Sequence, residues 1–252
     1  MEIDMIVHTY EEDGRSLACK GALLRNAEKI GLGRALVLPI PTTRDKIHLK
    51  GSEILLEDIV KDADGDTLAI GYGMPEGFAS ALTARGASVY DAELDESFLE
   101  RNAELTALAT LGILLTSEKR ALRDLSFGIV GFGRIGRLLA RMLLFHGAAV
   151  KIYTSKSRTL LELGGVGLSC ETSGKDADLS SVDILINTAP AVIFTDGVPS
   201  GIRVIDLASG DNFPGTGVEK YPSVPAKMFP VSAGEALALG AVSFISERGR
   251  CI

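Results

Sequence analysis

The chain has 252 residues, of which 46% are hydrophobic and 23% are charged, so a full core can form in one large domain or two modest ones. Its formal net charge of −7 argues against a nucleic-acid surface, because neutralising phosphates requires clustered cations. The longest mainly apolar run, residues 105–115, is too short to cross a bilayer, and the first residues show no signal-peptide pattern. Three widely spaced cysteines indicate neither a metal site nor a disulfide framework. We therefore expect a cytoplasmic protein with no metal, membrane or nucleic-acid partner.

Strands and helices alternate through the first part of the chain. The expected strands are residues 3–7, 35–38, 67–70 and 88–90, and the expected helices are 16–30, 53–61 and 78–85. This alternation is typical of a parallel sheet with helices on both faces. Residues 1–98 are therefore predicted to form a flavodoxin-like domain on the substrate side of the protein.

A long helical pattern over residues 97–116 is predicted to bridge to a second α/β domain, residues 99–252. Further strands are expected at 127–130, 148–153, 183–187 and 203–207, with a short helix at 160–163 and an irregular loop at 211–230. A final helix is expected at 232–246, with Ser232 as N-cap and Glu235 as its capping-box partner. The predicted fold class is α/β, with two doubly wound parallel-sheet domains joined by long helices, the second a Rossmann NAD(P)-binding domain.

The stretch that follows the strand at 127–130 has the spacing of a dinucleotide fingerprint. Gly131, Gly133 and Gly136 fit G-x-G-x-x-G, in which the glycines allow a tight turn, backbone approach to a pyrophosphate, and close packing of helix on strand. The helix N-terminus then offers free N–H groups to the phosphates. The alternative is a strand–helix–strand unit with no ligand. The residues predicted to bind the pyrophosphate are Gly131, Phe132, Gly133, Arg134, Ile135 and Gly136.

The loop after the next strand indicates which nicotinamide cofactor is bound. NAD enzymes place an acidic residue about 20 residues after the glycines, to hold the ribose hydroxyls. No acid stands there in this chain, whereas hydroxyls and two cations do, and these suit a 2′-phosphate. The sequence therefore favours NADP, with NAD as the alternative cofactor and a solvated basic loop as the alternative interpretation. The residues of this loop are Thr154, Ser155, Lys156, Ser157 and Arg158.

Residues after the other strands are predicted to surround the ligands, because ligands of open α/β sheets bind beyond the carboxyl ends of the strands. On the cofactor side these residues are Asn187, Thr188, Ala189, Pro190, Leu207, Ala208 and Ser209. On the substrate side they are Thr42, Thr43, Gly71, Tyr72, Gly73 and Met74. Each of them is also compatible with ordinary turn chemistry.

No acid–base group stands out in the sequence. None of the histidines, His8, His48 and His146, follows a strand of the second domain, and His146 is interpreted as a helix C-terminal residue. Asp206 lies at a strand end, where a structural role is the favoured interpretation. No catalytic residue is therefore assigned.

Several segments occur in an order that is also found in a known family. These are Asn-Ala-Glu-Leu-Thr at 102–106, the glycine motif, Ile-Leu-Ile-Asn-Thr-Ala-Pro at 184–190, Ile-Asp-Leu-Ala-Ser at 205–209 and Ser-Ala-Gly-Glu at 232–235. From Asn102 onward the chain resembles the A subunit of bacterial dipicolinate synthase, and it does so weakly at 38–43. The glycine motif is common to all Rossmann proteins, whereas the Asn-Thr-x-Pro and Asp-Leu-Ala-Ser pair is more specific.

The resemblance implies an NADP-linked oxidation of a dihydrodipicolinate-type ring to dipicolinate, the calcium chelator of bacterial spores. It also implies that the substrate lies between the two domains, with Asn102 shaping its pocket, and that a flavoprotein-like B subunit is a partner. We further expect a homo-oligomer.

The chain departs from the family where an arginine and a glycine pair should follow Asp-Leu-Ala-Ser, since residues 210–212 read Gly-Asp-Asn. A dicarboxylate would need cations, and the candidates are Arg44, Lys46 and Lys227. The second half also resembles D-2-hydroxyacid dehydrogenases, which use an Arg, an acid and a late His, yet no histidine follows His146. Two alternatives therefore stay open: a non-catalytic nucleotide-binding sensor or partner subunit, and a D-2-hydroxyacid dehydrogenase-like enzyme.

Overall fold

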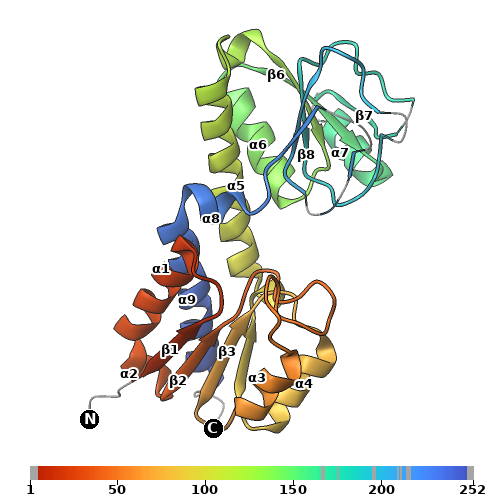
Figure 1. Ribbon diagram of the computed structural model, residues 1–252. Helices are drawn as coiled ribbons and strands as arrows, with labels where there is room; N and C mark the ends of the chain where they lie inside the picture. Colours follow the sequence, from red (N-terminus) through yellow and green to blue (C-terminus); the bar gives the residue numbers. More distant parts are fainter. Residues whose placement is uncertain are drawn as a thin grey trace. The chain divides into compact units, whose positions relative to one another are not determined.

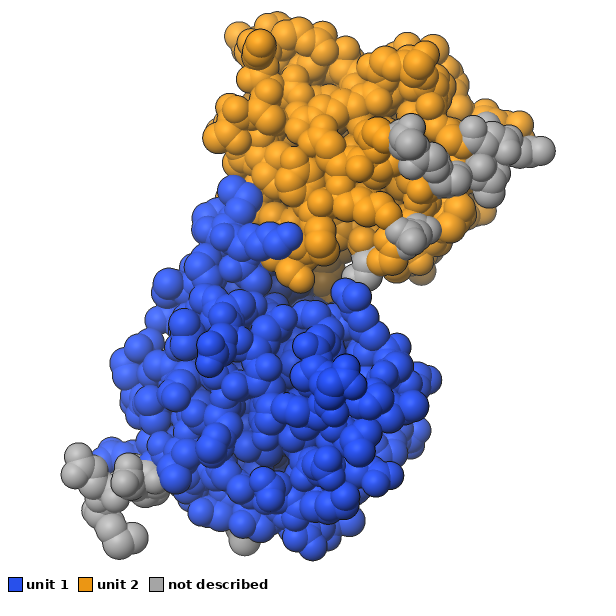
Figure 2. All heavy atoms as spheres, in the orientation of Figure 1, with its two compact units in different colours: residues 1–102, 225–252 blue, residues 103–224 orange. Residues whose placement is uncertain are grey.

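A computed structural model describes residues 5–165, 168–174, 176–194, 197–208, 210, 212–213 and 217–248. The chain forms two compact units, which Figure 2 distinguishes by colour. Unit 1 consists of residues Met1–Asn102 and Pro225–Ile252, and unit 2 of Ala103–Val224. The predicted fold class, two parallel-sheet α/β domains, is confirmed.

Unit 1 is built on a four-stranded parallel sheet in the order β1-β2-β3-β4. Its strands are β1 (Ile6–Thr9), β2 (Arg34–Val37), β3 (Thr67–Gly71) and β4 (Ser88–Asp91). Its helices are α1 (Gly14–Arg25), α2 (Ala27–Ile30), α3 (Leu56–Asp62), α4 (Glu76–Ala84), the 3-10 turn η1 (Ala92–Leu94) and α9 (Pro230–Arg248). The helices α5 (Glu96–Ser117) and α8 (Val224–Met228) lie where the chain passes from one unit to the other.

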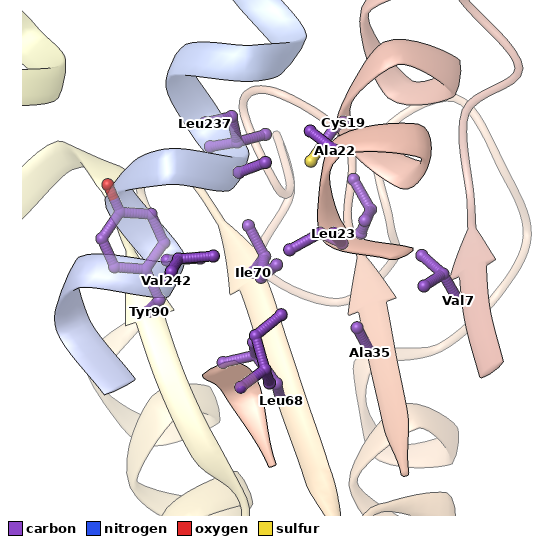
Figure 3. Close-up of a cluster of buried hydrophobic side chains, with 14 of the residues drawn as sticks. Val7, Cys19, Ala22, Leu23, Ala35, Leu68, Ile70, Tyr90, Leu237 and Val242 are labelled. Atoms are coloured by element: carbon purple, nitrogen blue, oxygen red, sulfur yellow. The ribbon is translucent and has the colours of Figure 1, made fainter. Parts of the chain in front are cut away.

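Both faces of this sheet are covered by helices. On β2, Ala35 and Val37 point into a core shared with α1, α2 and α9, whereas Leu36 points into a second core shared with α3 and α4. Figure 3 shows the first core, in which Leu23 of α1 and Leu237 of α9 meet side chains of the sheet. An unbroken apolar run is typical of a strand that is buried on both faces.

The last helix, α9, belongs to unit 1 and not to the second domain as predicted. It lies beside α1 (Figure 1), and a Cβ on Gly234 would come within 2.3 Å of the Arg15 carbonyl oxygen. Small residues therefore allow the two helices to approach closely. The predicted capping box is wrong, because α9 already begins at Pro230 and the Glu235 carboxylate pairs with Arg25 of α1 at 3.0 Å.

The strand order of unit 1 differs from the predicted flavodoxin-like order, in which the first strand is internal. In unit 1, β1 lies at the edge and β2 is internal. Accordingly, Ile6 of β1 is 57% exposed, whereas Ala35, Leu36 and Val37 of β2, which has neighbours on both sides, are all buried.

Unit 2 is built on a six-stranded parallel sheet in the order β10-β9-β8-β5-β6-β7. Renumbered within the unit this is 6-5-4-1-2-3, the dinucleotide-binding Rossmann order. Its strands are β5 (Ser126–Val130), β6 (Ala149–Thr154), β7 (Cys170–Thr172), β8 (Ile184–Asn187), β9 (Arg203–Asp206) and β10 (Val218–Lys220). Its remaining helices are η2 (Leu122–Asp124), α6 (Arg134–Phe145) and α7 (Ser157–Gly165).

The two faces of the second sheet are covered differently. Side chains of α5, α6 and α7 pack on one face, among them Leu114, Leu139 and Leu163. Loop side chains such as Leu179 and Phe194 cover the other. Loops therefore replace the helices that a doubly wound sheet would carry on that face, within the described ranges. Three elements of this unit and its boundary also differ from the prediction. The strand β10 and the helix α8 lie in the stretch that was expected to be irregular, and the strand β7 was not predicted.

Across the described ranges, no helix is both long and apolar enough to span a membrane, and no group of three or more His, Cys, Asp or Glu side chains could hold a metal ion. Cys19 is a buried free thiol and Cys170 a half-buried one. Cys251 lies outside the described residues.

Candidate functional site

The turn after β5 is held in a conformation that needs glycine. Gly131 has φ +90°, and its N–H donates to the Tyr153 carbonyl oxygen at 2.8 Å. A Cβ at this position would lie 2.9 Å from the Thr188 hydroxyl oxygen. Burial raises the pKa of Tyr153, whose hydroxyl donates to the Asp178 carbonyl oxygen at 2.6 Å. The carbonyl oxygen of Tyr153 thus holds the turn, while its neutral, anchored ring lies against Gly128 of β5.

The other two glycines of the motif meet opposite surroundings. A Cβ on Gly136 would lie 2.2 Å from the Gly131 carbonyl oxygen, so this glycine lets α6 pack directly on the turn. A Cβ on Gly133 would meet nothing within 4 Å, although Gly133 is the N-cap of α6. The backbone at the start of α6 is therefore exposed where helix N–H groups are unpaired and the helix dipole attracts anions.

Two arginines flank this helix start. Arg134 and Arg137 are both exposed in the first turn of α6. The Arg137 guanidinium donates from Nε to the Phe132 carbonyl oxygen at 3.1 Å and lies 5.6 Å from the centre of the Phe132 ring. This contact fixes Phe132 at the rim of the turn. Arg137 was not predicted as a site residue, although its place one turn after Arg134 would have indicated it.

The end of β8 brings a polar network to the same edge of the sheet. Asn187 is fully buried; its Nδ2 donates to the Asp206 carboxylate at 2.8 Å and to the Ala189 carbonyl oxygen at 3.0 Å, and its Oδ1 accepts the Ala189 N–H at 3.0 Å. That Asn187 borders the nicotinamide stays a prediction, because its side chain is engaged within the protein. Its buried amide instead fixes the loop that follows β8.

The carboxylate of Asp206 is a structural one, as the sequence suggested. It is 2% exposed and accepts hydrogen bonds from Asn187, from the Ala208 N–H at 3.1 Å and from Asn212 Nδ2 at 3.3 Å. Because all of these donors come from strand ends and loops, Asp206 ties the ends of β8 and β9 together.

The loops that follow β8 and β9 reach the carboxyl edge of the sheet, where the glycine turn also lies. Thr188 donates from Oγ1 to the Val130 carbonyl oxygen at 2.9 Å, which joins the β8 loop to the end of β5. Thr188, Ala189, Leu207 and Ala208 are half-buried and Pro190 is exposed. Ser209 lies outside the described residues.

The predicted 2′-phosphate loop lies at the end of β6. Thr154 is buried, and its hydroxyl accepts the Lys156 N–H at 3.3 Å, so it shapes the loop from below. Ser155, Lys156, Ser157 and Arg158 are exposed. Arg158 pairs with Glu162 at 2.9 Å, but its side chain is 91% exposed, so the pair is weak and open to competition. Ser157 is the first residue of α7.

The predicted substrate loops of unit 1 are mostly filled by their own side chains. Thr42 is fully buried and its Oγ1 accepts the Tyr72 N–H at 3.0 Å, while a Cβ on Gly71 would lie 2.6 Å from that same oxygen. The Asp91 carboxylate accepts the N–H groups of Gly73 and Met74 at 2.9 and 2.8 Å. The ends of β2, β3 and β4 are thus bonded to one another.

Two further predicted substrate residues lie outside this packed cluster. Thr43 is half-buried and hydrogen-bonds Asp45 at 3.2 Å, so its hydroxyl is engaged within its own loop. Hydrogen bonds from the His48 and Ile47 backbone and the His48 ring lower the pKa of Asp45. Asn102 is half-buried on α5.

Known proteins resemble this chain in sequence and in fold. No protein-family model matches the chain. Over 153 residues the chain is 28% identical to the A subunit of dipicolinate synthase from Bacillus subtilis, a region that covers 54% of this chain and 50% of the relative. The alignment spans about half of that relative's length, so the likeness in sequence does not carry the relative's activity with it.

Two solved structures define the fold relationship. The A subunit of dipicolinate synthase from Bacillus halodurans matches 98% of this chain and 99% of its own, with a TM-score of 0.75 and 22% identity. The apo-structure of D-lactate dehydrogenase from Escherichia coli matches 97% of this chain and 96% of its own, with a TM-score of 0.59 and 12% identity. The predicted resemblance is thus confirmed in sequence and in fold, and the fold is also that of a dehydrogenase.

Proposed function

We propose that the chain is an NADP-dependent oxidoreductase similar to the A subunit of dipicolinate synthase, acting in the cytoplasm. The observation that carries this proposal is the turn from β5 to α6, in which Gly131 and Gly136 are sterically required while the Cβ position of Gly133 is empty. A turn needed only for packing has no use for a glycine in open space. Backbone approach by a pyrophosphate requires one.

The residues present fit a nicotinamide dinucleotide. The N-terminus of α6, with Arg134 and Arg137 beside it, would hold the pyrophosphate, since exposed N–H groups and cations suit phosphate oxygens. Thr188, Ala189, Leu207 and Ala208 would border the nicotinamide. When bound, the cofactor would supply hydride transfer, while the chain binds it, orients it and limits the access of water.

The choice of NADP depends on the exposed loop after β6. Lys156, Ser157 and Arg158 would surround the 2′-phosphate, and no carboxylate stands where NAD enzymes hold the ribose hydroxyls. Glu162 is the nearest competitor, because it already pairs with Arg158. A 2′-phosphate with two negative charges would outcompete this exposed pair.

For the substrate, the likeness to dipicolinate synthase favours a dihydrodipicolinate-type ring, oxidised to the aromatic pyridine dicarboxylate as NADP takes up a hydride. The proposed substrate contacts that remain partly exposed are Thr43, Tyr72, Gly73 and Asn102. Arg44 and Lys46 are exposed cations for the carboxylates. We further propose that the active form is a homo-oligomer and that a flavoprotein-like second subunit is its partner in spore formation.

Calorimetric titration of the purified chain with NADPH and with NADH tests the cofactor directly. We expect NADPH to bind at least tenfold more tightly. In Arg158→Ala, the loss of one charge-assisted contact, worth about 1.5–3 kcal/mol, should weaken NADPH binding roughly tenfold or more and leave NADH binding unchanged. Arg141→Ala, at an exposed cation on α6, is the matched control. Equal affinities for the two cofactors would overturn the choice of NADP.

A second candidate function is a non-catalytic nucleotide-binding subunit. It is favoured by the absence of any histidine after His146 and of any arginine between Arg203 and Arg248. A turnover assay distinguishes the two functions. If the chain, alone or with a second subunit, oxidises the dihydro-ring and reduces NADP, the enzyme is supported. Tight NADPH binding without turnover under either condition supports the sensor.

A further inference from the structure

Strand β4 is an edge strand of unit 1 whose outer side pairs with no described strand. Its outward-facing groups follow from the hydrogen bonds on the other side of the sheet. The Leu38 N–H donates to the Ile70 carbonyl oxygen at 2.8 Å, so Ile70 faces β2, and alternation turns its neighbours Ala69 and Gly71 toward β4. In a parallel pair, the residues opposite these two, Val89 and Asp91, face away from β3, so Val89 directs its N–H and C=O and Asp91 its N–H toward the free edge. The Asp91 carbonyl oxygen instead begins η1, of which Asp91 is the N-cap.

A groove of about 1230 Å³ lies along this edge and is formed by unit 1 alone. We call it the β4 groove. Residues of β4 form its floor, α4 forms one wall and α9 the other, and the segment from η1 into α5 closes one end. Figure 1 shows α4 and α9 on opposite sides of the first sheet. Two helices that flank an unpaired strand leave a slot with the shape of one more strand.

The strand order also indicates room for one more strand beside β4. A flavodoxin-like sheet carries a fifth strand beside the fourth, whereas the sheet of unit 1 ends at β4 among the described residues. Folded proteins usually cover, shorten or charge a free edge, because its unpaired backbone groups recruit other chains. In this unit the edge lies in an open groove, and the apolar side chains of Leu94 and Leu239 on its walls are 84% and 56% exposed.

The charge of the groove selects its occupant. Among the described residues, seven acidic side chains line it, and Arg101 is the only cation. The carboxylates of Glu76, Glu93 and Glu247 make no ion pair with any described residue, and they lie on both walls and at the closed end. A second copy adding its own β4 would bring acids against acids. A strand carrying lysines or arginines would instead satisfy the edge and neutralise the walls.

We propose that the β4 groove binds an extended, basic segment of a partner protein, which adds to the first sheet as a fifth strand. The N–H and C=O of Val89 and the N–H of Asp91 supply the main-chain hydrogen bonds. Leu94 and Leu239 contact its apolar side chains, and Glu76, Glu93 and Glu247 pair with its cations. The proposal goes beyond nucleotide binding and does not depend on it, since unit 2 contributes nothing to the groove.

The test uses the full chain and a fluorescein-labelled peptide, Lys-Thr-Lys-Val-Lys-Thr-Lys, read by fluorescence polarisation, with the Lys→Glu peptide as its charge control. We expect the basic peptide to bind with an affinity that falls as salt rises, and the acidic peptide not to bind. Val89→Pro removes one outward N–H and leaves the bonds to β3 intact, so it should weaken binding about tenfold or more.

Val7→Pro is the matched control, because the Ile6 and Tyr10 N–H groups bond β2 and Val7 therefore faces the opposite free edge. It should leave peptide binding unchanged, with thermal melts confirming that both variants fold. If Val89→Pro fails to fold, hydrogen exchange of the wild-type chain replaces it, and the basic peptide should slow exchange at the Val89 and Asp91 amides.

Three results would overturn the proposal. The first is no binding of the basic peptide, or equal binding of the acidic one. The second is peptide binding that Val89→Pro does not weaken, or that does not slow hydrogen exchange at the Val89 and Asp91 amides. Either result would mean that the peptide binds by charge attraction without adding a strand. The third is a homodimer in sedimentation that Val89→Pro dissociates and Val7→Pro does not, which would identify a second copy as the occupant. Failure of nucleotide binding would leave the proposal untouched.

Discussion

The two parallel sheets differ in how much space surrounds the glycines at the carboxyl ends of their central strands. In unit 2, the strand β5 runs into Gly133, where a Cβ would meet nothing within 4 Å. In unit 1, the strand β3 ends at Gly71, where a Cβ would lie 2.6 Å from both Thr42 Oγ1 and Met74 Cε. One strand end leaves its backbone exposed, and the other is closed by its own side chains. The same architecture thus provides an open edge in one unit and a packed edge in the other.

The largest effect is expected inside the glycine turn. Gly136→Ala places a methyl group against the Gly131 carbonyl oxygen, and because that neighbour is backbone, the start of α6 must move. We expect a loss of roughly 3 kcal/mol in the free energy of unfolding, measured by urea denaturation, together with loss of NADPH binding. Gly164→Ala, a helical glycine with open space around it, should be neutral or slightly stabilising. Equal stability of the two variants would contradict the described packing.

Gly133→Ala separates binding from folding. The methyl group enters open space, so the unfolding free energy should change by no more than about 1 kcal/mol, as expected for an N-cap change. The same methyl group occupies the surface proposed for the pyrophosphate, so NADPH affinity should fall roughly 100-fold, about 2.7 kcal/mol. Calorimetry and denaturation on one sample check both numbers. Normal binding in this variant would remove the main support for a nucleotide site.

Gly71→Ala is the matching change in unit 1. The added methyl group meets a buried threonine oxygen and the end of a flexible methionine, so partial relaxation is expected. We predict a loss of about 1–2 kcal/mol in stability and no change in NADPH affinity. A weakened nucleotide affinity in this variant would mean that the closed strand end takes part in cofactor binding.

The smallest effect concerns the buried thiol of unit 1. Burial raises the pKa of Cys19 to about 12, whereas the unfolded thiol titrates near 9.0. Its contribution to stability is fully present below pH 9 and is lost as the pH rises toward 12. Between pH 7.5 and pH 10 the wild-type chain should therefore lose about 1 kcal/mol that Cys19→Ala does not lose. Val242→Ala, a non-titrating truncation in the same core, should lose stability with pH as the wild type does.

Much of unit 2 could be predicted from the sequence because glycine spacing is a direct steric requirement. The strand before Gly131 and the helix after it were correctly placed, and the surroundings of Gly131 and Gly136 explain why no other residue fits. The burial of Asn187 could not be predicted, because sequence alone cannot distinguish a polar side chain at a strand end that faces a ligand from one buried against Asp206.

Unit 1 was predicted less completely because its organisation depends on long-range packing. The assignment of α9 to unit 1 rests on small residues such as Gly234, which matter only beside α1, more than 200 residues earlier in the chain. The edge position of β1 likewise depends on how the four strands of the unit pair with one another. Neither relation leaves a local pattern in the sequence.

The return of the chain to unit 1 has a consequence for biosynthesis. Unit 2 is inserted within unit 1, and the core of unit 1 includes Leu237, Ala238 and Ala241 of α9. On a ribosome, the first sheet to be made is therefore the last to be completed. One of its faces is covered only by α1 and α2 while the whole of unit 2 is translated. Nascent chains stalled before residue 225 should lose unit 1 to protease while keeping unit 2. The N-terminal part of unit 1 thus cannot complete its core until α9 has been translated. During this interval, apolar side chains of the first sheet are accessible to a chaperone.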